Sequence, residues 1–290
     1  MIAAGPGFGL TDHVPHTAKE HAMSFVRFAR SALVTIALVA ASASTMAGPA
    51  TARPLPTIVL VHGAFADRTS WDPVAAALHG RGYTVVVPDN PLRGPVYDAA
   101  AVEKTLAGIS GPVVLVGHSY GGAVITNTHN PNVKALVYVA AFAPAQGEPV
   151  QLALDPIRFP GSQLLPPVLQ VKAVDDAHAI GGRNLDGYIA ADAFHRVFAP
   201  DVSDATAATM LTHQRSIALW ANLEPSGPTS WSNIPSWSLI PTRDNIIPPA
   251  AQRFMAGRIG AHTTEIAASH AVLVSQPAAV AAVIATAAGS

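Results

Sequence analysis

Short apolar runs alternate with helical patterns between residues 57 and 140, and this alternation constrains the fold more than any other feature. The run at 57–62 is continuous and rich in β-branched residues, as expected for a strand buried on both faces. Similar runs follow at 83–87, 112–116 and 133–140, and helical patterns lie between them at 74–79, 98–108 and 122–128. Because parallel strands are joined by right-handed helical crossovers, the pattern predicts an α/β fold, a mostly parallel sheet with helices on both faces.

The alternation stops after Phe142. The segment 144–235 is rich in Pro and Gly and has two stretches of helical pattern, at 185–198 and 203–220. Strand patterns then return at 236–240 and 262–267, with helices at 249–258 and 277–287. Long insertions into compact domains are usually lids or binding elements. We therefore expect a core formed by 53–143 and 236–290, interrupted by an insertion at 144–235.

The N-terminal region has the layout of a secretory signal peptide. Two arginines precede an apolar run at 32–40, and small residues ending at Ala52 form a cleavage site, with 41–43 as a second one. The apolar run is shorter than the roughly 20 residues that a membrane anchor needs. We expect 1–52 to be an N-terminal extension and signal peptide, with the true start at Met23. This predicts a secreted or periplasmic protein without a stable membrane anchor.

Composition excludes several classes of function. The 17 basic residues are balanced by 18 acidic ones, for a formal charge of −1. Without a basic excess to neutralise phosphates, we expect no nucleic-acid partner. The chain has 0 Cys, which rules out disulfides, thiolate metal sites and a cysteine nucleophile.

A candidate nucleophile follows the predicted strand at 112–116. Residues 117–121 read Gly-His-Ser-Tyr-Gly and open a helix. This matches G-x-S-x-G, in which a sharp strand-to-helix turn exposes the serine hydroxyl, here that of Ser119. The alternative is an ordinary glycine-rich turn. A serine nucleophile also needs a base that takes its proton and an acid that orients the base.

Two later residues fit those roles. His270 follows the predicted strand at 262–267, and Asp244 follows the one at 236–240. The carboxyl ends of parallel strands meet at one edge of the sheet, where Ser119 also emerges. The order Ser, Asp, His along the chain is the one that accompanies a G-x-S-x-G serine on a parallel sheet of this kind. We therefore predict a triad of Ser119, Asp244 and His270. Glu148 is an alternative acid, but it lies well past the end of its strand.

The loop after the first strand supplies a candidate oxyanion hole. Acyl transfer generates an oxyanion, which two backbone N–H groups can bind, one after the nucleophile and one from this loop. We assign these groups to Tyr120 and Ala64, with Phe65 as the alternative to Ala64. Gly63 allows the close approach of the backbone that such a site requires.

Several segments jointly resemble the α/β-hydrolase superfamily and its small esterase branch. That branch includes plant methyl-ester esterases such as the salicylate-binding esterase, the hydroxynitrile lyases and many bacterial carboxylesterases. The similar segments are 59–65, 116–122, 244–248 and 269–277. The resemblance implies a mostly parallel sheet of eight strands, of which about six are visible here. It also implies that 144–235 is a helical cap, inserted after the sixth family strand and covering the site.

Departures from related enzymes narrow the expected reaction. Ala271 stands where hydroxynitrile lyases have a lysine, Gly63 where they have a threonine, and Ser119 where epoxide hydrolases and dehalogenases have an aspartate. We expect a serine carboxylesterase that forms an acyl-enzyme without metal or organic cofactor. Its partner would be a small hydrophobic or aromatic ester. The candidate lining residues are Phe65, Leu164, Leu165, Phe194 and Trp220, although packing in the core of the cap is the more usual role of such side chains. A cofactor-free lyase, a C–C bond hydrolase or a non-catalytic binding protein are the alternatives.

Overall fold

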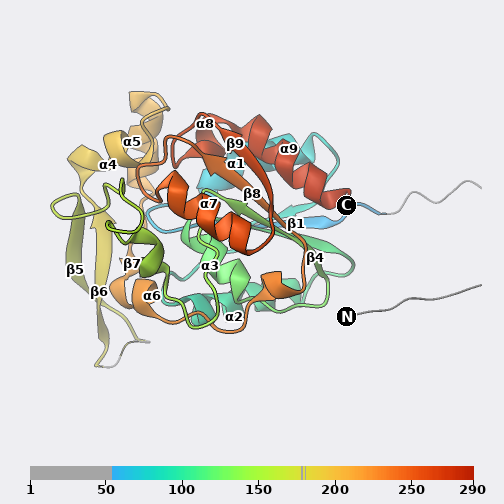
Figure 1. Ribbon diagram of the computed structural model, residues 1–290, viewed down its shortest axis with the longest axis horizontal. Coiled ribbons are helices and arrows are strands. Elements are labelled where there is room, and N and C mark those ends of the chain that lie inside the picture. The colour runs from blue at the N-terminus through green and yellow to red at the C-terminus, as the bar shows by residue number, and fades with distance from the viewer. Residues whose placement is uncertain (1–53, 178, 180) are drawn as a thin grey trace, which may run out of the picture. The chain divides into compact units, whose positions relative to one another are not determined.

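The central element of the fold is a sheet of six parallel strands (Figure 1). The computed structural model describes residues 54–177, 179 and 181–290; the predicted signal peptide lies outside them. In sheet order the strands are β2 (Val85–Val86), β1 (Thr57–Val61), β3 (Val113–His118), β4 (Val133–Val139), β8 (Ser236–Pro241) and β9 (His262–Ile266). The predicted mostly parallel sheet is confirmed, and so are its six visible strands.

Helices cover both faces of the sheet. Successive side chains of a strand point to opposite faces, so a continuously apolar strand has two apolar faces that must be buried. Ile58 and Leu60 of β1 pack into one apolar cluster, whereas Val59 and Val61 pack into the other. Fully burying each such side chain contributes about 1.5–3 kcal/mol. The first cluster includes α1 (Asp72–His79), α8 (Val272–Ser275) and α9 (Pro277–Ala288), and the second includes α2 (Pro95–Leu106), α3 (Tyr120–Thr126) and α7 (Pro249–Arg258). The short 3-10 helix η1 (Arg68–Trp71) precedes α1.

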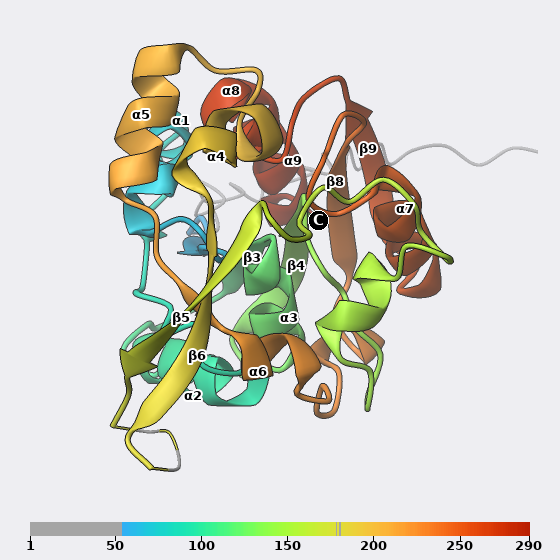
Figure 2. The same ribbon diagram turned by 90° about the vertical axis from the view of Figure 1, so that its left-hand side faces the viewer.

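The insertion carries a sheet of its own. Three antiparallel strands pair in the order β5-β6-β7, to one side of the central sheet (Figures 1 and 2). Its elements are η2 (Val150–Leu154), β5 (Leu169–Asp175), β6 (Arg183–Ile189), α4 (Ala191–Phe198), α5 (Asp204–Thr212), β7 (Ile217–Ala218), α6 (Leu219–Leu223) and η3 (Ser230–Ser232). Within the residues described, no helix is both long and apolar enough to span a bilayer.

The insertion, which the resemblance implies to be a helical cap, is therefore helical only in part. The predicted helix at 185–198 begins only at Ala191, because the residues before it form β6 and pair with β5 along its full length. The predicted helix at 203–220 ends at Thr212, and Ile217 pairs with Gly187 of β6. Strand preference depends on cross-strand neighbours, which a local helical pattern does not report.

Candidate active site

Ser119 occupies a sharp turn between β3 and α3. Its backbone has φ 54° and ψ −123°, outside the regions that residues with a Cβ favour. Such strain typically costs about 1–3 kcal/mol and persists only where the surroundings hold it. The turn is tight: a Cβ on Gly117 would lie 2.5 Å from the Gly121 carbonyl oxygen, and one on Gly121 would lie 2.5 Å from that of Val61. The glycines of the motif are therefore required by close backbone contacts.

The structure brings Ser119, His270 and Asp244 together. The His270 Nε2 atom lies 2.9 Å from the Ser119 hydroxyl, and His270 Nδ1 lies 2.8 Å from Oδ2 of Asp244. The three residues are buried, with exposures of 4%, 0% and 4% for Ser119, His270 and Asp244. If Nδ1 donates to the carboxylate, Nε2 is free to accept the serine proton. This is the arrangement that a general base requires.

The Asp244 carboxylate is oriented by more than His270. Oδ1 accepts hydrogen bonds from the backbone N–H groups of Ile246 and Ile247, at 2.8 and 3.0 Å, and Oδ2 accepts one from the Gln252 amide at 2.8 Å. Gln252 lies on α7 and was not predicted, since a single Gln in a helical pattern carries no signal. Glu148, the alternative acid, instead pairs with Arg258 at 2.7 Å.

His270 packs against a second histidine, His118. His118 Nε2 lies 2.9 Å from the His270 carbonyl oxygen, and their rings are 4.8 Å apart. Complete burial, reinforced by the neighbouring His270, lowers the pKa of His118 well below its usual value. A neutral His118 donates this bond through Nε2 and adds no charge beneath His270. Phe198 of α4 packs its ring edge against His270 at 5.1 Å.

The predicted oxyanion loop lies against the nucleophile turn. A Cβ on Gly63 would lie 2.6 Å from the Ser119 Cβ and 3.2 Å from the Tyr120 nitrogen. Tyr120 is the first residue of α3, where a helix leaves N–H groups without intrahelical acceptors. The Phe65 N–H donates to the Arg215 carbonyl at 2.9 Å, whereas that of Ala64 has no partner within the described part of the chain. Ala64 is therefore better placed than Phe65 to pair with Tyr120.

His62 braces this loop. Its Nε2 accepts the Asn90 backbone N–H at 3.1 Å, and the Asn90 amide donates to the His62 carbonyl at 2.8 Å. The His62 Nδ1 therefore donates to the Gly63 carbonyl, 2.9 Å away. Burial lowers the pKa of His62, which matches its neutral form in these bonds.

A cavity of about 120 Å³ opens at Ser119. Three predicted lining residues, Phe65, Leu164 and Leu165, contribute to its wall. Polar side chains of Gln151 and Asn222 also line it, and no sequence pattern singled them out. We call this space the catalytic cavity.

The lining prediction is wrong for Phe194 and Trp220. Phe194 is 1% exposed and stacks on Phe198 inside the insertion, 5.1 Å between ring centroids. Trp220 is 60% exposed and lines a separate hollow beside Arg183. The sequence shows that both side chains are apolar, but the spacing of apolar residues does not show whether each of them points toward the cavity.

No group of three or more histidine and carboxylate side chains that could hold a metal ion occurs among the residues that the structure describes. Each polar side chain of the triad is instead bonded to another protein group.

The family profile described as "Alpha/beta hydrolase family" matches residues 58–283, which include the triad, the oxyanion loop and the insertion. The chain belongs to this family.

Two relatives and one solved structure extend the comparison. A carbendazim hydrolyzing esterase of a Nocardioides species is 33% identical over 136 residues, 42% of this chain and 53% of the relative. A pyrethroid hydrolase of Sphingobium wenxiniae is 36% identical over 104 residues, 31% of this chain and 37% of the relative. The alignments thus span about half or less of these two proteins.

The similarity to the solved structure extends over more of this chain than the two sequence alignments do. An extracellular α/β-hydrolase of a Paenibacillus species, described as sharing structural and functional homology with tobacco salicylic acid binding protein 2, has a TM-score of 0.61 and 25% identity. It matches over 81% of this chain and 99% of its own.

Proposed function

We propose that this α/β hydrolase is a serine carboxylesterase. The observation that carries the proposal is the hydrogen-bonded series Ser119, His270 and Asp244, with two backbone N–H groups beside the serine. A neutral His270 with Nδ1 bound to a carboxylate is the form that accepts a serine proton. Relatives named as an esterase and a hydrolase support the same reaction class.

The mechanism follows from the positions of these groups. The Ser119 oxygen attacks the acyl carbon while His270 Nε2 takes the hydroxyl proton, and Asp244 stabilises the imidazolium. The oxyanion lies between the N–H groups of Ala64 and Tyr120, each contributing about 2.7–4 kcal/mol to the transition state. His270 then returns its proton to the departing alcohol. Water, deprotonated by His270, releases the acid and restores Ser119.

The substrate class that we propose is small hydrophobic or aromatic esters. Apart from Gln151 and Asn222, the wall contributed by the insertion is mostly aliphatic, with Leu154, Leu164 and Leu165 among its residues. An apolar wall with a few polar groups binds uncharged ligands and orients them.

Ester hydrolysis by the full chain and by Ser119→Ala tests this proposal. With p-nitrophenyl acetate we expect the variant to lose about 10³-fold or more in kcat, because it lacks the nucleophile. A fluorophosphonate should add to Ser119 of the wild type, as read by mass spectrometry of the labelled peptide. Equal rates in a folded variant, or labelling elsewhere, would overturn the serine mechanism. A labelled Ser119 without ester turnover would point instead to a lyase or a C–C bond hydrolase.

A further inference from the structure

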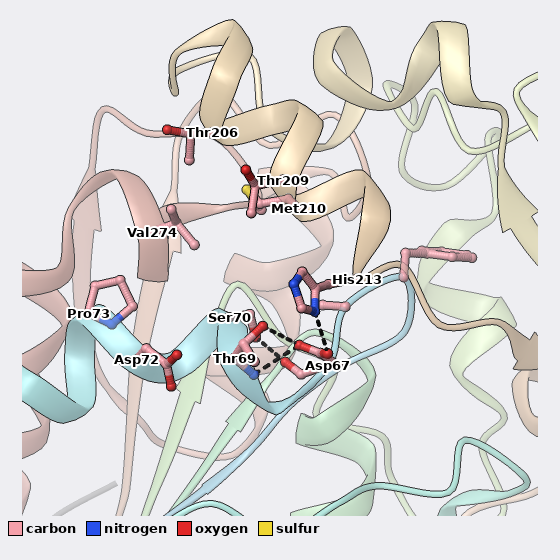
Figure 3. A pocket seen from close by; sticks show the side chains of 12 residues that line it. Asp67, Thr69, Ser70, Asp72, Pro73, Thr206, Thr209, Met210, His213 and Val274 are labelled. Atoms are coloured by element: carbon pink, nitrogen blue, oxygen red, sulfur yellow. Dashed lines mark hydrogen bonds and ion pairs between the residues drawn. The ribbon is translucent and has the colours of Figure 1, made fainter.

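A second cavity lies behind Phe65. It has a volume of about 330 Å³ and is formed between α5 of the insertion and the η1–α1 region of the core (Figures 2 and 3). Among the described residues, Phe65 is the one that lines both this space and the catalytic cavity. We call the space the second cavity. Its neighbour at Ser119 is smaller, at about 120 Å³, and is below the roughly 300–1,000 Å³ usual for ligand sites.

The backbone of Phe65 is held in place. Its φ is +61° and its N–H is bonded to the Arg215 carbonyl, so the chain direction there is set from both core and insertion. The residue is 5% exposed. Ala64 before it faces the catalytic cavity and Ala66 after it faces the second cavity. The phenyl ring is therefore the part of this segment that can be shortened while the backbone path stays the same.

Apolar and polar side chains together line the second cavity. Ala66, Met210 and Val274 contribute apolar atoms. Across the cavity from Met210 and Val274, Asp67 accepts hydrogen bonds from Thr69 at 2.5 Å and from His213 at 3.0 Å (Figure 3). Partial burial raises the pKa of Asp67, but these hydrogen bonds outweigh it and lower the pKa below its usual value. An ionised carboxylate disfavours anionic groups, whereas an uncharged aromatic ring with a polar substituent suits a lining of both kinds.

We infer that Phe65 sets the size limit of the ester, because its side chain separates the catalytic cavity from the second cavity. The inference rests on the proposed esterase function. Shortening the side chain would join the two spaces and admit a bulky, uncharged aromatic group on one side of the scissile bond. Small esters, which fit the catalytic cavity alone, do not need the added space.

The test is a ratio of kcat/KM values for large and small esters. The small ester is p-nitrophenyl acetate; the large ones are p-nitrophenyl 4-phenylbutyrate, bulky in its acid, and 3-phenoxybenzyl acetate, bulky in its alcohol. For Phe65→Ala we expect the large-to-small ratio to rise at least tenfold for one of the two large esters. A change of this size is typical of the discrimination that a hydrophobic pocket provides. Phe65→Leu should give a smaller rise and guards against misfolding of the alanine variant.

The control is a second substitution that fills the second cavity again in the Phe65→Ala variant. Met210 lines that cavity but not the catalytic one, so Met210→Trp in the Phe65→Ala background should return the ratio toward the wild-type value. Leu165→Ala is the matched control, since Leu165 lines only the catalytic cavity. Any gain that it produces should be insensitive to Met210→Trp.

Several outcomes would overturn the inference. One is an unchanged ratio in folded Phe65 variants, and another is a gain that Met210→Trp does not reverse. A third needs no Phe65 variant: if Met210→Trp alone impairs large esters in the otherwise wild-type protein, the two cavities are already continuous. Absence of p-nitrophenyl acetate hydrolysis by the wild type would instead reject the proposed function, so the two failures are distinguishable.

Discussion

The core and the insertion hold their polar groups by different means. In the core, Ser119 and Asp244 follow β3 and β8, whose residues are all buried, and His270 follows the edge strand β9, which is held by its regular pairing with β8. In the insertion, five of the seven residues of β5 are exposed, and its sheet has only three strands. Burial therefore holds the two central strands of the core, whereas the exposed sheet of the insertion is also held by discrete contacts of charged side chains.

Two carboxylates of the insertion, Asp186 and Asp201, make contacts with residues of the core. Asp186 of β6 binds the Arg93 guanidinium through two bonds of 2.7 and 2.9 Å. Asp201, which follows α4, accepts hydrogen bonds from the backbone and side chain of Ser269, next to His270, and from Ser275 at 2.9 Å. The core thus contains the three residues of the predicted triad, and the insertion bonds to the loop that carries His270.

The largest effect is expected from adding a side-chain atom between the predicted oxyanion loop, which contains Gly63, and the turn at Ser119. Gly63→Ala would place a Cβ 2.6 Å from the Ser119 Cβ and 2.8 Å from the His118 carbonyl oxygen. Something must shift, and the oxyanion donors lie in the same loops, so we expect kcat for p-nitrophenyl acetate to fall about 10²–10³-fold.

Gly257→Ala provides the control for that substitution. Gly257 lies in α7 and its added Cβ would meet nothing within 4 Å. Removing a helical glycine should stabilise the protein by about 0.5–1 kcal/mol without affecting kcat. Equal activity of Gly63→Ala and wild type would contradict the geometry assigned to the oxyanion loop.

A second effect is expected where core and insertion meet at Asp98. This fully buried carboxylate accepts hydrogen bonds from the Tyr120 hydroxyl and the Arg93 N–H, and Glu224 of the insertion faces it. Burial, with a smaller contribution from Glu224, raises the pKa of Asp98 from 3.8 to about 6. The folded protein thus binds more protons than the unfolded chain between these values, and the unfolding free energy falls as pH rises from about 4 to about 6.

Urea unfolding of Asp98→Asn at several pH values measures that contribution. The shift from 3.8 to about 6 corresponds to about 3 kcal/mol, and we expect the wild type to lose this amount relative to the variant over the same pH window. Asp192→Asn, at an exposed position on α4, should give a curve parallel to that of the wild type. Parallel curves for Asp98→Asn as well would show that Asp98 does not titrate in this range.

The smallest effect concerns the contact from the insertion to the His270 loop. Partial burial raises the pKa of Asp201, but hydrogen bonds from Ser269 and Ser275 outweigh it and lower the pKa, so the residue is ionised at neutral pH. Asp201→Asn removes the charge and turns one of the two acceptor oxygens into a donor, so a single carbonyl oxygen remains for the donors of Ser269 and Ser275. We expect kcat to fall about tenfold, equivalent to about 1.4 kcal/mol, with KM changed little.

Steady-state kinetics of Asp201→Asn beside Asp204→Asn checks this prediction. The Asp204 side chain is 98% exposed in its pair with His195, and exposed ion pairs contribute little. A lower melting temperature with unchanged kcat would mean that Asp201 only stabilises the fold.

Local sequence patterns predicted the core well because its signals are themselves local. Ser119, Asp244 and His270 each follow a strand pattern, and parallel strands bring their carboxyl ends to one edge. The contact between Asp201 and Ser269 joins residues 68 positions apart, and no pattern in either segment indicates it. The strand β6 differs from the helix predicted at 185–198 because its conformation is set by pairing with β5 and β7, which the apolar spacing within that segment does not report.

The adjacency of β4 and β8 has a consequence for how such proteins diversify. These strands pair directly, with Leu136 opposite Ser236, although the whole insertion, residues 144–235, lies between them in the chain. The segment therefore leaves and rejoins the sheet at neighbouring strands, and each doubling of such a connection costs only about 0.6 kcal/mol in closure entropy. The insertion can therefore change in length while the strands that precede Ser119, Asp244 and His270 keep their pairing, provided that contacts such as that of Asp201 with Ser269 are kept.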